Sequence, residues 1–139
     1  MSYKKILVAF DGTEHSLKAF GHALDMAKDQ GARLMVLSVA VPPEPPVDVE
    51  LEEMLEEAEE RFREYFKKLE DAARQKGVEM EFQIVVGHPA EQIIHQAKEY
   101  GADHIVVGHR GNNPLAEWLL GSVSKRVSTY APCSVTVVR

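Results

Sequence analysis

Two patterns of apolar and polar residues follow one another along the chain. In the first, short and almost continuous apolar runs are typical of strands buried in a sheet. They cover residues 6–10, 34–41, 81–86, 104–107 and 135–138. In the second, apolar residues recur three and four positions apart, which predicts amphipathic helices. These cover residues 15–30, 50–76, 89–100 and 122–130.

The order of these elements predicts the fold class. Strands and helices alternate as βαβαβαβαβ. This order favours an α/β fold in which a five-stranded, mostly parallel sheet carries helices on both faces, as in Rossmann-like domains. A chain of 139 residues fits one compact domain, so we expect a single domain over residues 1–139. In such sheets ligands bind beyond the carboxyl ends of the strands, where the winding direction reverses.

The longest predicted helix, 50–76, has a clear apolar stripe. We expect its inward side to consist of Leu51, Leu55, Ala58, Phe62, Tyr65, Leu69 and Ala72. The charged residues around this stripe favour a solvated face with i,i+4 ion pairs over a docking surface. Before the helix, the proline-rich residues 42–46 predict a stiff surface connection.

Composition and charge argue against several classes of function. The chain is 45% hydrophobic and 27% charged, as ordinary globular proteins are. Its net charge of −6 argues against general binding to nucleic acid or to an anionic membrane, although a local site can still take ATP. No apolar run approaches the ~18 residues of a membrane span. The single cysteine, Cys133, excludes an intramolecular disulfide, and by default we expect a cytoplasmic protein.

A glycine and serine pattern near the C-terminus carries the first candidate chemistry. The segment G-H-R-G (108–111) follows a predicted strand, and nine residues later G-S-V-S (121–124) opens a predicted helix. Glycine lets backbone N–H groups approach a ligand closely, and a helix N-terminus offers unpaired N–H donors with a partial positive charge. The pattern therefore predicts a site for the phosphate chain of a nucleotide.

A second loop with polar side chains stands after the first strand. Asp11-Gly12-Thr13 follows the run 6–10, and G-H-R-G follows the fourth strand. If the first and fourth strands are neighbours in the sheet, these two loops face each other across the crevice where ligands bind. The sequence pattern alone leaves that adjacency open.

Three segments spread over the whole chain resemble the universal stress protein (UspA-like) family. They are KILVAFDGTEHS (5–16), VGHP (86–89), and a C-terminal part that holds both the glycine and serine pattern and APCSVTVV (131–138). The ATP-binding branch of that family is marked by G-2x-G-9x-G-(S/T), and this chain matches the pattern in full. The chain departs from many members at His109, where they carry a small hydroxyl residue, and at Ser134, where they carry proline. The role of His109 is open.

The resemblance implies an ATP site. Its residues would be Ala9, Asp11, Val39, Val107, Gly108, Arg110, Gly111, Gly121, Ser122, Val123 and Ser124. Asp11 would lie near the ribose and a bound Mg²⁺, which a carboxylate suits. Val39 would lie beside the adenine, and Gly108 with Gly111 would flank the ribose and phosphates. Residues 121–124 would hold phosphates through backbone N–H and hydroxyl groups.

Several of these residues have simpler alternatives. Gly111 and Gly121 could serve only as loop turns, and Asp11 could belong only to a turn that ends the strand. Arg110 could be a surface charge rather than a phosphate contact. Ser122 could cap its helix, which uses the same geometry as phosphate binding and is compatible with it.

The sequence lacks the motifs of the common enzymes that handle phosphate or acyl groups. Phe10-Asp11-Gly12-Thr13 is similar to the first motif of haloacid dehalogenase-like phosphatases, but Ala9 stands where their nucleophilic aspartate would be. The P-loop, the Rossmann glycine fingerprint and the hydrolase elbow are absent. No histidine or cysteine pair has metal-site spacing. Slow ATP hydrolysis stays possible, since Mg²⁺ and helix-end donors stabilise phosphoryl-transfer charge.

Together these observations predict an ATP-binding regulatory module of the stress response. ATP would act as a switch by stabilising one conformation or assembly, with residues 42–46 and 111–121 as the moving parts. The resemblance also implies a homodimer through the last strand, 135–138, whose β-branched edge suits pairing; the downstream protein partner is open. Two rivals are a slow Mg²⁺-dependent ATPase or phosphotransferase using Asp11 with Ser122 or Ser124, and a nucleotide-free dimeric scaffold.

Overall fold

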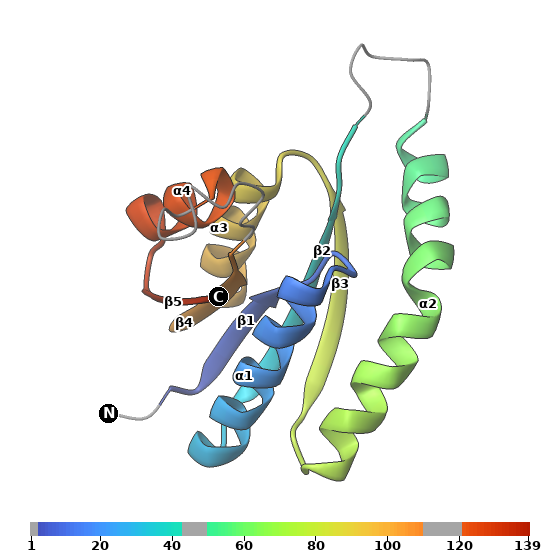
Figure 1. Cartoon of the computed structure of the whole chain (residues 1–139). Coiled ribbons are helices and arrows are strands. Elements are labelled where there is room, and N and C mark those ends of the chain that lie inside the picture. Colours follow the sequence, from blue (N-terminus) through green and yellow to red (C-terminus); the bar gives the residue numbers. More distant parts are fainter. Residues whose placement is uncertain (1–2, 43–49, 110–120) are drawn as a thin grey trace.

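Five parallel strands form one sheet in the order β3-β2-β1-β4-β5 (Figure 1). The computed structural model describes residues 3–42, 50–109 and 121–139. The strands are β1 (Lys5–Ala9), β2 (Arg33–Ala40), β3 (Met80–Val86), β4 (His104–Gly108) and β5 (Ser134–Val138). All four pairings are parallel, and β1 pairs with both β2 and β4. The predicted fold class is confirmed, and the first and fourth strands are neighbours.

Helices cover both faces of the sheet (Figure 1). They are α1 (Glu14–Gln30), α2 (Leu51–Gln75), α3 (Pro89–Tyr100) and α4 (Ser122–Tyr130). Two buried clusters follow the alternation of side chains along the strands. Val8 packs in the cluster under α1 and α2, and its neighbour Leu7 packs in the cluster under α3 and α4. Each predicted element is present, with bounds that differ by no more than one residue.

The helix ends follow local sequence signals. Helices α1 and α3 end at Gly31 and Gly101, whose φ values of 65° and 75° lie in the left-handed region that glycine adopts at little cost. Helix α3 begins with Pro89, which suits a first-turn position because its missing N–H would have no partner inside the helix. Among the described residues, no helix is both long and apolar enough to cross a membrane.

The predicted apolar stripe of α2 is wrong at its N-terminal end. Leu51 is 59% exposed, and the buried residues of the helix are Ala58, Phe62, Leu69 and Ala73. A 25-residue helix is about 37 Å long, whereas the seven residues of β3 span about 23 Å. The first turn of α2 therefore lies beyond the end of β3, as Figure 1 shows, and has no strand to pack on.

One glycine sets how closely α1 approaches the sheet. A Cβ added at Gly108 would lie 2.7 Å from the backbone oxygen of His15, closer than real side chains come. Because His15 is in the first turn of α1, the absence of a side chain at Gly108 brings the start of α1 against the end of β4. Gly21, in the interior of α1, is different, since nothing lies within 4 Å of a Cβ placed there.

We therefore expect opposite effects from two glycine-to-alanine substitutions. Gly108→Ala forces apart two backbone segments and should lower the free energy of unfolding by about 1–3 kcal/mol. Gly21→Ala adds a better helix former in open space and should raise it by about 0.5–1 kcal/mol. Urea unfolding followed by circular dichroism measures both. A Gly108→Ala protein as stable as the parent would contradict the close approach of α1 and β4.

Candidate functional site

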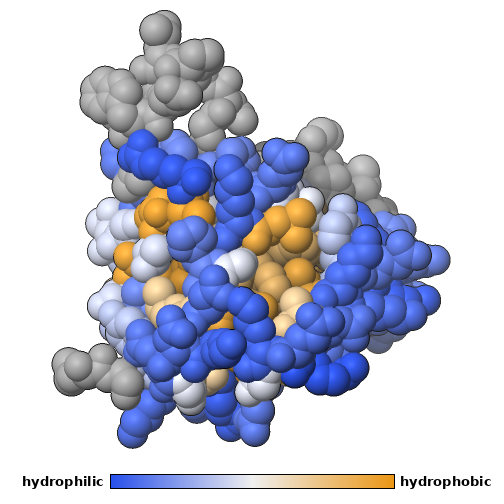
Figure 2. Space-filling view, turned by 60° about the horizontal axis from the view of Figure 1, so that its bottom comes forward, coloured by the Kyte–Doolittle hydropathy of each residue, from blue (hydrophilic) through white to orange (hydrophobic). Residues whose placement is uncertain are grey.

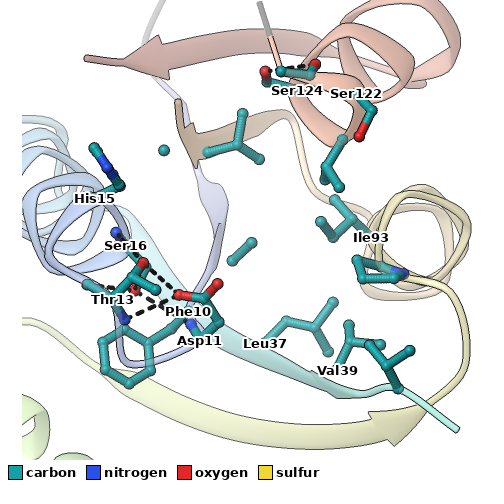
Figure 3. Close-up of a pocket in the computed structure, with 17 residues that line it drawn as sticks. Phe10, Asp11, Thr13, His15, Ser16, Leu37, Val39, Ile93, Ser122 and Ser124 are labelled. Carbon is teal, nitrogen blue, oxygen red and sulfur yellow. Dashed lines mark hydrogen bonds between the residues drawn. The ribbon is translucent and has the colours of Figure 1, made fainter. Parts of the chain in front are cut away.

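A cavity of about 420 Å³ lies at the carboxyl ends of β1, β2 and β4 (Figure 3). This is the place where the winding of the sheet reverses, because β1 leads outward to β2 while β4 returns on its other side. The cavity is bounded by the turn after β1, the end of β2 and the starts of α3 and α4. Its lining residues are Ala9, Phe10, Asp11, Thr13, His15, Ser16, Leu37, Val39, Val41, Pro89, Ile93, Val107, Gly108, Gly121, Ser122, Val123 and Ser124.

One wall of this cavity is apolar. In Figure 3, Leu37, Val39 and Ile93 lie together on one side, and Ala9 and Val107 also line the cavity. Leu37 and Val39 face it together because alternate residues of a strand point to the same face of a sheet. Ile93 is contributed by α3, one turn after Pro89. A flat apolar group would lose its water here without leaving polar groups unpaired.

The turn after β1 holds a carboxylate in a fixed position. Ser38 donates from Oγ to the carbonyl oxygen of Phe10 at 2.8 Å, which secures the chain where it leaves the sheet. Asp11 Oδ1 then accepts from the backbone N–H of Thr13 at 3.0 Å and from its hydroxyl at 2.6 Å. Such a bond from an aspartate to the backbone two residues on is an Asx turn. In Figure 3, Asp11 and Thr13 lie side by side, and dashed lines mark the hydrogen bonds between them.

The same turn caps α1. Thr13 Oγ1 accepts from the backbone N–H of Ser16 at 3.3 Å, and the Ser16 hydroxyl donates back to the Thr13 carbonyl at 2.9 Å. Glu14 places a negative charge in the first turn. The N-terminus of α1 is thus satisfied within the protein, both by a side-chain hydrogen bond and by a compensating charge.

The start of α4 is different. Gly121 is the N-cap and offers no side chain, and the first turn, which the structure describes in full, holds no acidic residue. The Gly121 carbonyl accepts from the backbone N–H of Lys125 at 2.9 Å and from the Ser124 hydroxyl at 3.1 Å. Within the described parts of the chain, the N-cap residue makes no side-chain hydrogen bond to the N–H groups of this turn. They provide the donors and the positive end of the helix dipole that an anion requires.

The cavity brings together most of the predicted site residues. Nine of them line it: Ala9, Asp11, Val39, Val107, Gly108, Gly121, Ser122, Val123 and Ser124. Arg110 and Gly111 lie outside the described residues, as does most of each predicted moving segment. Gly108 has a second role beyond its predicted place beside a ligand, since it also admits the first turn of α1.

Sequence reasoning missed eight lining residues. These are Phe10, Thr13, His15, Ser16, Leu37, Val41, Pro89 and Ile93. The two-residue period of the predicted strand 34–41 could have added Leu37 and Val41 to Val39. Pro89 and Ile93 could not be found in this way, because only the packing of α3 on the sheet brings them to the cavity.

The chemistry of the lining residues limits what the cavity can hold. Among the described residues that line the cavity, Asp11 is the one acidic side chain, and none is lysine or arginine. Among the described residues, no three His, Cys, Asp or Glu side chains meet as a metal site. A lone carboxylate still fits Mg²⁺, which usually takes one or two protein carboxylates and completes its shell with phosphates and water.

Comparison with known proteins adds to this geometry. The chain is 36% identical to universal stress protein YxiE of Bacillus subtilis, with 99% of each chain covered. It is also 36% identical to universal stress protein MJ0531 of Methanocaldococcus jannaschii, covering 99% of this chain and 82% of that one. A solved structure of a universal stress protein in complex with cAMP has a TM-score of 0.80 and 27% identity, covering 100% and 99% of the two chains.

The family model that matches the chain is the one described as the universal stress protein family, and the match spans residues 2–139. It thus includes every strand and helix described above. By this match, and by relatives at 36% identity over nearly its whole length, the chain belongs to the universal stress protein family.

Proposed function

We propose that the chain binds ATP together with Mg²⁺ in the cavity at the β1–β4 switch point and acts as a nucleotide-dependent regulatory module in the stress response. The observation that carries this proposal is the division of the cavity. An apolar wall suited to a base lies on one side, and on another lies a helix N-terminus whose N-cap, Gly121, has no capping side chain, which suits phosphate. The related structure with cAMP supports an adenine nucleotide as the ligand class.

The base would lie against the apolar wall. Leu37, Val39 and Ile93 offer a surface on which a purine ring can pack, and burial of this kind stabilises by about 25 cal/mol for each Å² removed from water. The ribose would then lie beside Asp11, whose carboxylate can accept hydrogen bonds from hydroxyl groups. In this orientation the phosphates extend toward residues 121–124.

The phosphates would bind at the start of α4 rather than at that of α1. At α1, Thr13 already accepts from a first-turn N–H, and Glu14 would repel an anion. At α4 the first turn holds no acidic residue and the N-cap glycine has no capping side chain, and the exposed Ser122 adds a hydroxyl donor at the cavity edge. Asp11 would hold Mg²⁺ directly or through water, and this ion would offset the repulsion between the carboxylate and the phosphates.

Regulation by ATP requires that one state binds the nucleotide better than another. A ligand at about 100 times its Kd stabilises the binding state by roughly 2.7 kcal/mol, which is enough to change a balanced population strongly. The nucleotide would in this way select the conformation or assembly that a downstream partner meets.

A charge placed at Ser122 tests the phosphate site. Ser122→Glu adds a carboxylate to the first turn of α4, where the helix dipole should keep or raise stability by about 0.3–1 kcal/mol while repelling phosphate. We expect at least a tenfold loss of ATP affinity by calorimetric titration. Adenosine, which lacks phosphate, should bind the variant and the parent equally well.

Ser122→Ala is the matched control, since it removes the hydroxyl without adding charge and should weaken ATP binding only a few-fold. Equal ATP affinity in the parent and the glutamate variant would exclude phosphate from the start of α4. No binding of any adenine nucleotide by the parent protein would instead favour the nucleotide-free scaffold.

The role of Asp11 in holding Mg²⁺ can be separated from its role in the turn. Asp11→Asn keeps an Oδ1 acceptor for Thr13, so the Asx turn should persist, but it removes the negative charge. We expect Mg²⁺ to strengthen ATP binding in the parent. In the variant, the ratio of the ATP affinity with Mg²⁺ to the affinity without it should be about tenfold smaller. Titrations with ATP in Mg²⁺ and in EDTA give the two ratios. Identical ratios in the parent and the variant would contradict a role for Asp11 in binding Mg²⁺.

The edge strand β5 supports a second element of the proposal, a homodimer. Among the described strands, β5 pairs with β4 alone, and Val135 and Val137 are half-buried although they pack against the core. A β-branched edge with unpaired backbone groups is a template for another strand. We propose that a second copy of the chain covers it.

Sedimentation velocity should therefore show a dimer in the parent protein. Val137→Lys places a charge on the edge, where the long aliphatic stem can still cover apolar neighbours. We expect this variant to sediment as a monomer with an unchanged circular dichroism spectrum. A parent protein that stays monomeric at about 100 μM would contradict the dimer, since this concentration exceeds the micromolar Kd typical of weak specific interfaces.

A further inference from the structure

We infer that His109 is a positioning residue for the cavity: through one hydrogen bond to Gly121 it sets where the first turn of α4 lies. The inference rests on the proposed nucleotide function for its consequence, but the hydrogen bond is a property of the chain itself. His109 does not line the cavity, and it stands at the position where the sequence departs from the small hydroxyl residue of many family members.

His109 joins three elements at the end of the sheet. It directly follows β4 and is only 4% exposed. Its backbone N–H donates to the carbonyl oxygen of Val138, the last residue of β5, at 2.8 Å. Its ring nitrogen Nδ1 accepts from the backbone N–H of Gly121 at 3.2 Å. The backbone of His109 is thus anchored on the sheet, and its side chain holds the N-cap of α4.

The hydrogen bond defines the form of the ring. A backbone N–H can only donate, so Nδ1 must carry no proton, and the neutral ring then has its proton on Nε2. Nε2 is buried and has no hydrogen-bond partner among the described residues. In the described part of the chain, the contact with Gly121 is therefore the polar interaction that orients the ring.

This arrangement fixes α4 through the N–H of Gly121, which is then not available to a ligand, and does not involve the N–H groups of Ser122, Val123 and Ser124. At α1, the capping side chain of Thr13 takes the N–H of Ser16, a donor of the first turn. At α4, His109 takes the N–H of the N-cap residue Gly121, one position before the helix. The Gly121 carbonyl is held by the helix itself. The N-cap is thus held at both its N–H and its carbonyl, while the N–H groups that follow remain directed outward from the helix start.

The position of this turn matters because hydrogen bonds to phosphate oxygens tolerate only a narrow range of distances. Gly121, Ser122, Val123 and Ser124 all line the cavity, so a shift of the N-cap moves four lining residues together. A side chain that merely fills the space of His109 would preserve packing and lose this control. A positioning role and a space-filling role of His109 therefore predict different ATP affinities when polar residues of similar size replace it.

Three substitutions separate these roles. Asparagine places its Oδ1 at about the position of the ring Nδ1, whereas glutamine places its acceptor one bond farther from the backbone, and leucine has none. At about pH 8, where histidine is ordinarily neutral, we expect His109→Asn to bind ATP within a few-fold of the parent. His109→Gln and His109→Leu should bind about tenfold more weakly in calorimetric titrations with ATP and Mg²⁺.

A measurement on the nucleotide-free protein decides the hydrogen bond itself. Nitrogen-15 NMR of the ring should show an unprotonated Nδ1, and hydrogen exchange at the Gly121 amide should be slow in the parent and in His109→Asn. Exchange should be faster in His109→Gln and His109→Leu, although circular dichroism shows them folded. Thermal unfolding measures the stability that each variant loses. This loss can then be compared with the variant's loss of ATP affinity in the titrations.

The outcomes are distinct. Rescue by asparagine, together with protection of Gly121, supports the positioning role. Equal ATP affinity in all four proteins, affinity that falls only in step with stability, or a proton on Nδ1 overturns it. A parent protein that binds no ATP contradicts the proposed function, and the hydrogen-exchange data then test the positioning role alone. A Gly121 amide that is protected from exchange supports the role of His109 in positioning α4. An unprotected Gly121 amide overturns it.

Discussion

The parallel pairing of β1 with β4 is the contact on which the rest of the structure depends. The chain builds outward from β1 to β2 and β3, then returns to place β4 on the other side of β1. Segments almost 100 residues apart in the sequence are thereby joined, with Ile6 opposite His104. Because both strands run in the same direction, their carboxyl ends open into one cavity, which both Asp11 and Gly108 line. Gly108 completes the junction by admitting α1 against β4.

Figure 2 shows apolar patches framed by a mostly hydrophilic surface, as expected of a sheet whose two faces are covered by amphipathic helices. The long helix α2 covers the sheet and also contacts the turn after β1. Tyr65 is 38% exposed, yet its ring packs edge-on against Phe10 and lies 3.6 Å from a Cβ placed on Gly12. The residue belongs to the predicted stripe, but it supports the turn that carries Asp11 rather than the centre of the core.

The fold and much of the cavity could be predicted from the sequence because both follow from short-range periodicity. Apolar runs identified each strand, and their alternation with helices indicated where ligands bind. What could not be predicted depends on contacts between distant elements. The exposure of Leu51 follows from the length of α2 relative to β3, and the place of Ile93 follows from how α3 packs. The sequence left the role of His109 open because its partner, Gly121, lies 12 residues away on another element.

The polar groups of the cavity are held mainly by contacts on their far side. Ser38 and Tyr65 support the turn after β1 from the sheet and from α2, and His109 holds Gly121 from the ends of β4 and β5. A preorganised site loses less entropy when a ligand binds, since its groups are already ordered. In this chain the elements that hold those polar groups from behind include α2, through Tyr65, and the edge strand β5, through Val138 and His109.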